Sequence, residues 1–203
     1  MSSTENAVPF VELVSTLKKA VAALREAELP YLLAGGLAIW ARGGPERDHD
    51  LDFLVKAEDA ERALQVLVDT GMSPERPPED WLLKAYDENG VLVDLIFRPS
   101  ETPVTDEMIE RGDELEVMAI KVNVVSAGDV LVSKLLALRE HELDYDTIVE
   151  MTRAVREQID WPDVRARTEH SPFARAFFTL AEGLDLVEPF HVDTASGTAR
   201  ATS

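Results

Sequence analysis

The sequence contains no cysteine, so it cannot form a disulfide framework, a thiolate metal site or a thiol nucleophile. It also has no apolar run of about eighteen residues, and therefore no membrane-spanning helix is expected. The first residues show no basic stretch followed by an apolar one, which is the pattern of a secretory signal. We expect a cytoplasmic protein with no membrane partner.

Positive charge is scarce as well, with 20 Lys and Arg against 39 Asp and Glu, for a net charge of −19. Such a chain repels polyanions at long range, which disfavours a general nucleic-acid binder. The deficit is uneven, however, because residues 121–175 carry 8 basic and 10 acidic side chains. A nucleic acid could therefore be bound at one local surface within this segment.

The chain has enough apolar residues, 45% of 203, for one well-formed core. We expect an α/β core over residues 8–125, a helical region over 126–188, and disordered tails at 1–7 and 189–203. Apolar periodicity and turn signals predict helices near 9–27, 58–70, 105–111, 129–141, 144–158, 161–168 and 171–186. Strands are expected near 31–34, 50–55, 116–118 and 120–125, and as a hairpin, 81–86 with 91–97, around Asn89-Gly90.

Residues 33–55 read as a strand, a Gly35-Gly36 turn, a short helix and a second strand with Asp50 and Asp52. Residues two apart in a strand share a face, so these carboxylates are neighbours and repel each other unless a cation lies between them. By itself, this spacing more often marks a solvated strand face. The preceding glycines favour a phosphate-binding site instead, because a glycine turn before a helix lets the backbone approach a phosphate.

Two other charged residues interrupt apolar runs. Asp94 lies in the second arm of the predicted hairpin, and it faces either solvent or a site. Lys134 lies in an apolar helical run, where it either occupies an exposed helix face or offers a point charge to a triphosphate. In the second case, Asp144 or Asp146 would orient its ammonium group.

Together, Gly35-Gly36, Asp50-x-Asp52 and Asp94 resemble the nucleotidyltransferase superfamily with the DNA polymerase β-like fold. The elements around Lys134, Arg139 and Asp144-Tyr145-Asp146 resemble the AbiEii/MenT-type toxin nucleotidyltransferases, which often have Ser or Thr where this chain has Asp48. Aminoglycoside and lincosamide nucleotidyltransferases share the Gly-Gly and D-x-D pattern. The resemblance runs from about residue 31 to residue 146.

The resemblance implies an α+β nucleotidyltransferase fold, a mixed β-sheet flanked by helices with a C-terminal helical bundle. It implies an enzyme that uses Mg²⁺, or Mn²⁺ in its place, to move a nucleoside monophosphate from an NTP to an acceptor hydroxyl. The site residues it implies are catalytic Asp50, Asp52, Asp94, Lys134 and Asp146; metal-binding Asp50, Asp52 and Asp94; and nucleotide-binding Gly35, Gly36, Arg47, Lys134 and Arg139.

Three interpretations of the acceptor remain open. The first is a tRNA end, which would make the protein a toxin with an antitoxin partner. The second is a small cationic molecule of the aminoglycoside or lincosamide type, which an acid-rich cleft favours electrostatically. The third is a non-catalytic nucleotide-binding module that has the fold but no acceptor.

Overall fold

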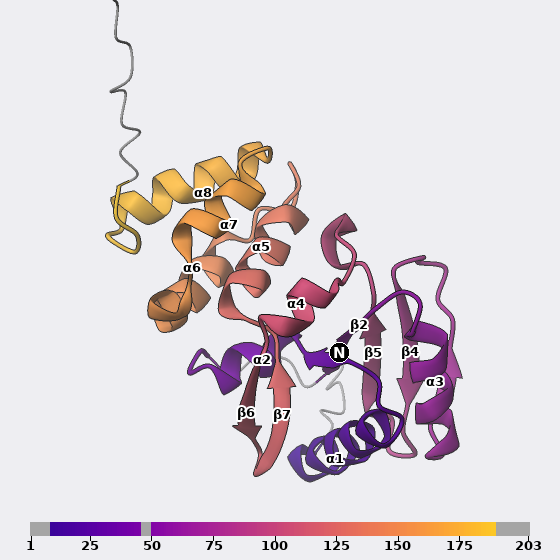
Figure 1. The fold of residues 1–203 in the computed structure, drawn as a ribbon. Helices are drawn as coiled ribbons and strands as arrows, with labels where there is room; N and C mark the ends of the chain where they lie inside the picture. Colours follow the sequence, from indigo (N-terminus) through magenta and orange to yellow (C-terminus); the bar gives the residue numbers. More distant parts are fainter. Residues whose placement is uncertain (1–8, 46–49, 190–203) are drawn as a thin grey trace, which may run out of the picture.

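The computed structural model describes residues 9–45 and 50–189, and Figure 1 shows their arrangement. The predicted tails at 1–7 and 189–203, apart from Pro189, lie outside these residues, and so do Arg47 and Asp48. Within them, no helix has the length and apolar character needed to cross a bilayer.

One seven-stranded sheet forms the centre of the molecule, with the strand order β3-β4-β5-β2-β1-β7-β6. The strands are β1 (Tyr31–Leu33), β2 (Leu51–Val55), β3 (Ser73–Glu75), β4 (Leu82–Tyr86), β5 (Leu92–Ile96), β6 (Asp113–Val117) and β7 (Ile120–Val124). β2 runs parallel to β5 and β1 parallel to β7, whereas the other neighbouring strands are antiparallel. The predicted α+β architecture with a mixed sheet is confirmed.

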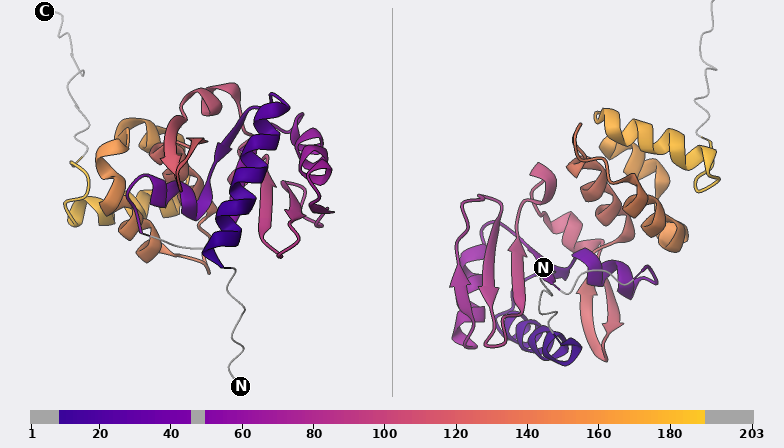
Figure 2. Two further views of the ribbon diagram at one scale, coloured as in Figure 1. Left: turned by 90° about the horizontal axis from the view of Figure 1, so that it is seen from below. Right: turned by 180° about the vertical axis from the view of Figure 1, so that it is seen from behind.

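In the described part of the chain, eight α-helices accompany this sheet: α1 (Phe10–Glu26), α2 (Gly35–Ala41), α3 (Ala60–Asp69), α4 (Asp106–Glu110), α5 (Ala127–Ala137), α6 (Tyr145–Val155), α7 (Trp161–Thr168) and α8 (Pro172–Gly183). Short 3₁₀ turns cover Pro99–Glu101 and Arg156–Gln158. α1 and α3 pack against each other beside the sheet, while α5 to α8 cluster at its other end (Figures 1 and 2).

α1 packs along the sheet because its apolar residues recur at helical spacing and form one fully buried stripe. Leu13, Leu17 and Leu24 are among its buried side chains. Two polar contacts fix the helix: near its middle the buried Thr16 hydroxyl donates to Asp87 in the β4–β5 turn, and near its C-terminal end Arg25 donates to the Lys121 carbonyl. α1 thus bridges the two hairpins of the sheet.

A buried carboxylate joins the sheet region to the helical cluster. Asp129, in the first turn of α5, has a side chain only 1% exposed and binds Arg111 after α4 and Arg167 of α7. Burial alone would raise the pKa of Asp129, but hydrogen bonds from Arg111, Ser126 and Arg167 outweigh burial and lower this pKa below its usual value. Three helices therefore meet at one ionised group, which we call the Asp129 clamp.

The structure differs from the sequence prediction at two places along the sheet. The proline-rich stretch 72–80, expected as a loop, contains β3, where Pro74 lies in an edge strand and needs no ladder hydrogen bond on its outer side. β6 begins at Asp113 and turns into β7 through Met118 and Ala119, whose φ angles are 52° and 60°. This tight turn lacks the glycine or asparagine that usually marks one.

Candidate functional site

The turn after β1 brings the backbone against the Asp52 side chain. The Ala34 amide donates to the Asp52 carbonyl across 2.8 Å, and Gly35, with a φ of +61°, then opens α2. A Cβ atom on Gly35 would collide with the Asp52 carboxylate. Only glycine satisfies both conditions, the left-handed φ and the close approach.

Asp52 and Asp94 lie side by side on adjacent strands. They are register partners in the parallel pair β2 and β5, so both side chains project from the same face of the sheet. Asp50 directly precedes β2 and is exposed. In β5, Val93 and Leu95 are buried on one face, which leaves Asp94 on the half-buried face with Leu92 and Ile96.

Lys84 is a site residue that the sequence interpretation missed. It is the register partner of Asp94 in the antiparallel pair β4 and β5, and its Nζ donates to Asp94 Oδ1 across 2.8 Å. Burial lowers the pKa of Lys84, but the hydrogen bond and the charge of Asp94 outweigh it and raise this pKa overall. The Asn89-Gly90 signal would not have revealed this pair, because a two-residue turn there sets residue 84 opposite residue 95, whereas the strands pair residue 84 with residue 94.

Lys134 of α5 lines a cavity of about 180 Å³ together with the glycine turn. The cavity is lined by Gly35, Gly36, Ile39, Pro45, Lys134, Asp144, Thr147 and Met151, and we call it the Lys134 cavity. A second cavity of about 290 Å³ also contacts Lys134, Asp144 and Thr147, and extends along α5 to Leu138. The glycine turn and the helical lysine, 99 positions apart in the sequence, thus line one space.

The two aspartates considered as partners of Lys134 occupy different places. Asp144 precedes α6, accepts a hydrogen bond from the Thr147 amide as its N-cap, and lines both cavities that Lys134 lines. Asp146 is exposed and lines a separate cavity with Glu150 and Arg153, which meets the Lys134 cavity at Pro45. The structure thus brings Asp144, rather than Asp146, to Lys134.

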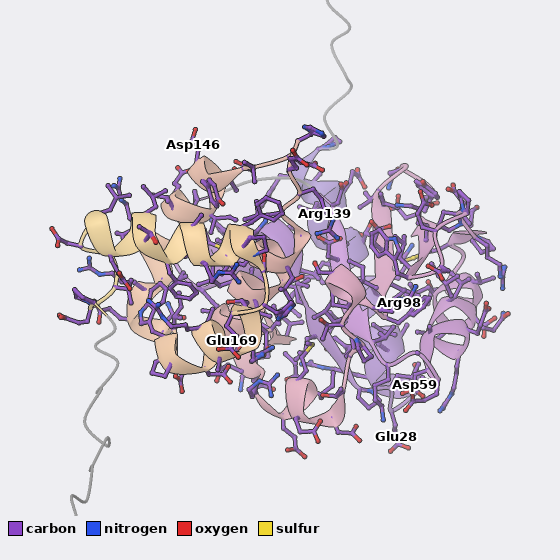
Figure 3. All side chains as sticks on the ribbon, turned by 90° about the horizontal axis from the view of Figure 1, so that it is seen from above. Glu28, Asp59, Arg98, Arg139, Asp146 and Glu169 are labelled. Carbon is purple, nitrogen blue, oxygen red and sulfur yellow. The ribbon has the colours of Figure 1, made fainter. Side chains whose placement is uncertain are left out.

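Arg139 lies past the end of α5, and its Nη1 donates to the Leu136 and Leu138 carbonyls. In Figure 3 it is seen between Asp146 on one side and Arg98 on the other. Its side chain lines a groove of about 620 Å³ that also touches Leu138, the residue at the far end of the second Lys134-lined cavity. Arg139 therefore lines this groove and not the Lys134 cavity, which contains the glycine turn.

A further arginine near the glycine turn, Arg42, stabilises the fold. Arg42 follows α2, is only 5% exposed, and binds Asp113 of β6, the Val124 and Val125 carbonyls, and Gln158. Arg47 lies outside the described residues.

The oxygen donors at this site suit a hard divalent cation. Within residues 9–45 and 50–189, no group of three Asp, Glu, His or Cys side chains is placed to hold a metal on its own. Mg²⁺ is commonly held by one or two carboxylates plus the phosphates of a substrate, so the Asp50 and Asp52 carboxylates fit this ion when a nucleotide completes its coordination.

A sequence model of the family described as "Uncharacterised nucleotidyltransferase" matches residues 4–184. The chain belongs to this nucleotidyltransferase family. The matched range includes Gly35 and Gly36, the carboxylates Asp50, Asp52 and Asp94, and every residue that lines the Lys134 cavity. A comparison with curated proteins finds no match.

Solved structures show the same fold at low sequence identity. A solution structure of the antibiotic-resistance factor ANT(2″)-Ia is 18% identical and has a TM-score of 0.59, covering 86% of this nucleotidyltransferase and 97% of that chain. A crystal structure of ANT(2″)-Ia with adenylyl-2″-tobramycin is 19% identical, with a TM-score of 0.57 and coverages of 84% and 98%. An antigenic nucleotidyltransferase-like protein from Paracoccidioides brasiliensis is 16% identical, with a TM-score of 0.53 and coverages of 87% and 90%.

Proposed function

We propose that this nucleotidyltransferase moves a nucleoside monophosphate from an NTP to an acceptor hydroxyl, with Mg²⁺ as its cofactor and Mn²⁺ as a substitute. One observation carries the proposal: Asp52, in register with Asp94, lies against the Gly35 turn, and that turn shares a cavity with Lys134. Carboxylates, a glycine turn and an ammonium group are the parts that bind a metal-complexed triphosphate.

In this proposal, Asp50, Asp52 and Asp94 would hold the metal together with the nucleotide, and the metal would supply positive charge against the negative charge that develops in the transition state. The backbone of Gly35 and Gly36 contacts the outer phosphates. Lys134 pairs with them as a point charge, and Asp144, beside it at the start of α6, orients the ammonium group.

The acceptor hydroxyl oxygen attacks the α-phosphorus in line with the leaving group. A new bond forms between that oxygen and phosphorus, the bond to the bridging oxygen breaks, and pyrophosphate leaves with its electron pair. The proton of the hydroxyl passes to a carboxylate oxygen of Asp94, which acts as the general base.

A tRNA end is the acceptor that we propose, and the groove beside Arg139 supports it. This groove is lined by Arg139, Arg167 and His170 together with the hydroxyls of Ser100, Thr102 and Ser171. No carboxylate is among its described lining residues, whereas Asp or Glu lines the Lys134 cavity, the second cavity beside it and the cavity at Asp146. In a chain of charge −19, this acid-free groove is the place where a phosphodiester fits.

Charge reversal in the groove tests this acceptor. We expect R139E to weaken binding of a fluorescent tRNA about tenfold and to reduce the salt dependence of binding by roughly one ion, because one phosphate contact is lost. R153E is the matched control, since Arg153 is an exposed arginine of the same helical region that lies beside Asp146 and Glu150. Equal tRNA affinity of the two variants would contradict the tRNA assignment.

A small cationic acceptor is the second candidate. Glu142 and Asp144 line the approach to Lys134, and acidic side chains attract a cation. The relative ANT(2″)-Ia was solved with adenylyl-2″-tobramycin, a nucleotidylated small molecule, and has this fold over 84% of the chain.

The deciding experiment is a transfer assay with each labelled NTP, Mg²⁺, and either total tRNA or a panel of aminoglycosides and lincosamides, with D50A as the blank. Label on tRNA would support a toxin role and justify a search for an antitoxin partner. Label on an antibiotic would establish the second candidate instead. If the protein binds nucleotide but labels no acceptor, the proposed transfer to either is wrong.

A further inference from the structure

A row of charged side chains crosses four strands on the face that carries the site. Glu75 of β3 is the register partner of Lys84, Lys84 is the partner of Asp94, and Asp94 is the partner of Asp52. Register partners project from the same face, so the charges along this row are negative, positive, negative and negative. Lys84 is the cation of this row.

The contact between Lys84 and Asp94 is shielded from solvent. Their side chains are 21% and 16% exposed, and the Nζ–Oδ1 distance is 2.8 Å. By contrast, Lys121 and Glu114 on the β6–β7 hairpin form a similar ion pair across 3.1 Å with side chains 73% and 51% exposed. Solvent screens the attraction between Lys121 and Glu114 strongly, because this pair is exposed. The attraction between Lys84 and Asp94 is screened much less.

We propose that Lys84 is the resident counter-ion of the metal-binding carboxylates, and that it occupies Asp94 until a nucleotide-bound divalent cation replaces it. This inference rests on the proposed function.

The consequence is that metal and nucleotide bind cooperatively. A bare divalent cation must displace the Lys84 ammonium from Asp94 and leave it without that partner. A cation that arrives with a triphosphate brings negative charge with which the displaced ammonium can pair. Lys84 therefore weakens the binding of the metal alone and couples it to the nucleotide.

Mn²⁺ titration of the full chain, followed by calorimetry or electron paramagnetic resonance, tests this role without an activity assay. We expect K84Q to bind Mn²⁺ about tenfold more tightly than the wild type without nucleotide, because a positive charge leaves the site. A non-hydrolysable NTP analogue should then increase Mn²⁺ affinity less in K84Q than in the wild type.

Three variants complete the design. K84R keeps the positive charge and is expected to bind Mn²⁺ as the wild type does, so it separates charge from misfolding. K121Q, which removes the exposed pair of the other hairpin, is expected to be unchanged as well. D52N removes a proposed ligand and should abolish the site-specific binding of Mn²⁺.

Unchanged or weaker Mn²⁺ binding by K84Q would overturn the counter-ion role. If D52N still loses Mn²⁺ in that case, the metal site of the proposed function stands and only the role of Lys84 falls. If D52N binds Mn²⁺ like the wild type, the metal site itself is wrong, and the counter-ion role falls with it.

Discussion

Two clusters of charge in the described residues differ in burial and in composition. In the Asp129 clamp, a carboxylate that is 1% exposed binds two arginines and Ser126, and the cluster ties α4, α5 and α7 together. In the row on the sheet, two half-buried carboxylates, Asp52 and Asp94, lie side by side, and Lys84 donates to Asp94. A fully buried carboxylate held between two arginines stabilises the fold, whereas two adjacent carboxylates that solvent can reach are able to bind a cation.

The comparison predicts opposite effects for two changes of Asp to Asn. D52N should lower nucleotidyl transfer by about a thousandfold or more, because it removes a metal ligand that stabilises charge in the transition state. Its melting temperature should change little, since Asn keeps the shape of the side chain. Transfer within tenfold of the wild type would remove Asp52 from the metal site.

D129N should lower the stability of the fold and leave nucleotidyl transfer nearly unchanged. Removing the charge leaves Arg111 and Arg167 without their shared carboxylate, and we expect a loss of about 3–5 kcal/mol in the free energy of unfolding. Chemical denaturation measures this loss, and residual transfer below the new melting temperature should stay near the wild-type rate. A stable D129N protein would show that the clamp contributes little.

The same clamp predicts a pH dependence. The pKa of Asp129 is lower in the folded state than in the unfolded state, so its contribution is complete above the unfolded value, near pH 4. It is lost as the pH falls through the lowered folded value. Acid denaturation of the wild type should therefore be steeper below about pH 4 than that of D129N.

A smaller effect comes from two glycines that both have positive φ. G35A should lose most of its transfer activity, because the new Cβ displaces the Asp52 carboxylate. G43A introduces a similar backbone strain, with a φ of +93°, but its Cβ would meet nothing within 4 Å. It should lose only about 1–2 kcal/mol of stability and keep its activity. Similar activities in the two variants would argue against the role of the Gly35 turn.

Much of the architecture could be predicted from the sequence, because it follows from periodicity and turn chemistry. The Asn89-Gly90 turn and the apolar runs on either side of it predicted β4 and β5, and the apolar stripe predicted α1. The tight turn at Met118 and Ala119 was missed, since its left-handed conformation is imposed by the pairing of β6 with β7 and not by its residue types.

The site was predictable only in part, for a related reason. A motif names residues that share a short stretch of chain, such as Gly35-Gly36 or Asp50 and Asp52. It does not name Lys84, which reaches the site through strand pairing, nor does it distinguish Asp144 from Asp146 beside Lys134. The function of Arg42 was hidden as well, because its partners lie about 70 to 116 positions away.

Arg42 also joins the helix of the glycine turn to distant parts of the chain. The helix that begins at Gly35 ends beside a guanidinium group fixed to β6, to the end of β7 and to Gln158 after α6. The segment from Gly35 to Arg42 is therefore fixed at both ends, by the close contact of Gly35 with Asp52 and by the hydrogen bonds of Arg42. We expect a compound that separates the C-terminal helices from the sheet to displace this segment and so lower the activity of the enzyme. Such a compound would not need to enter the space where the nucleotide is proposed to bind.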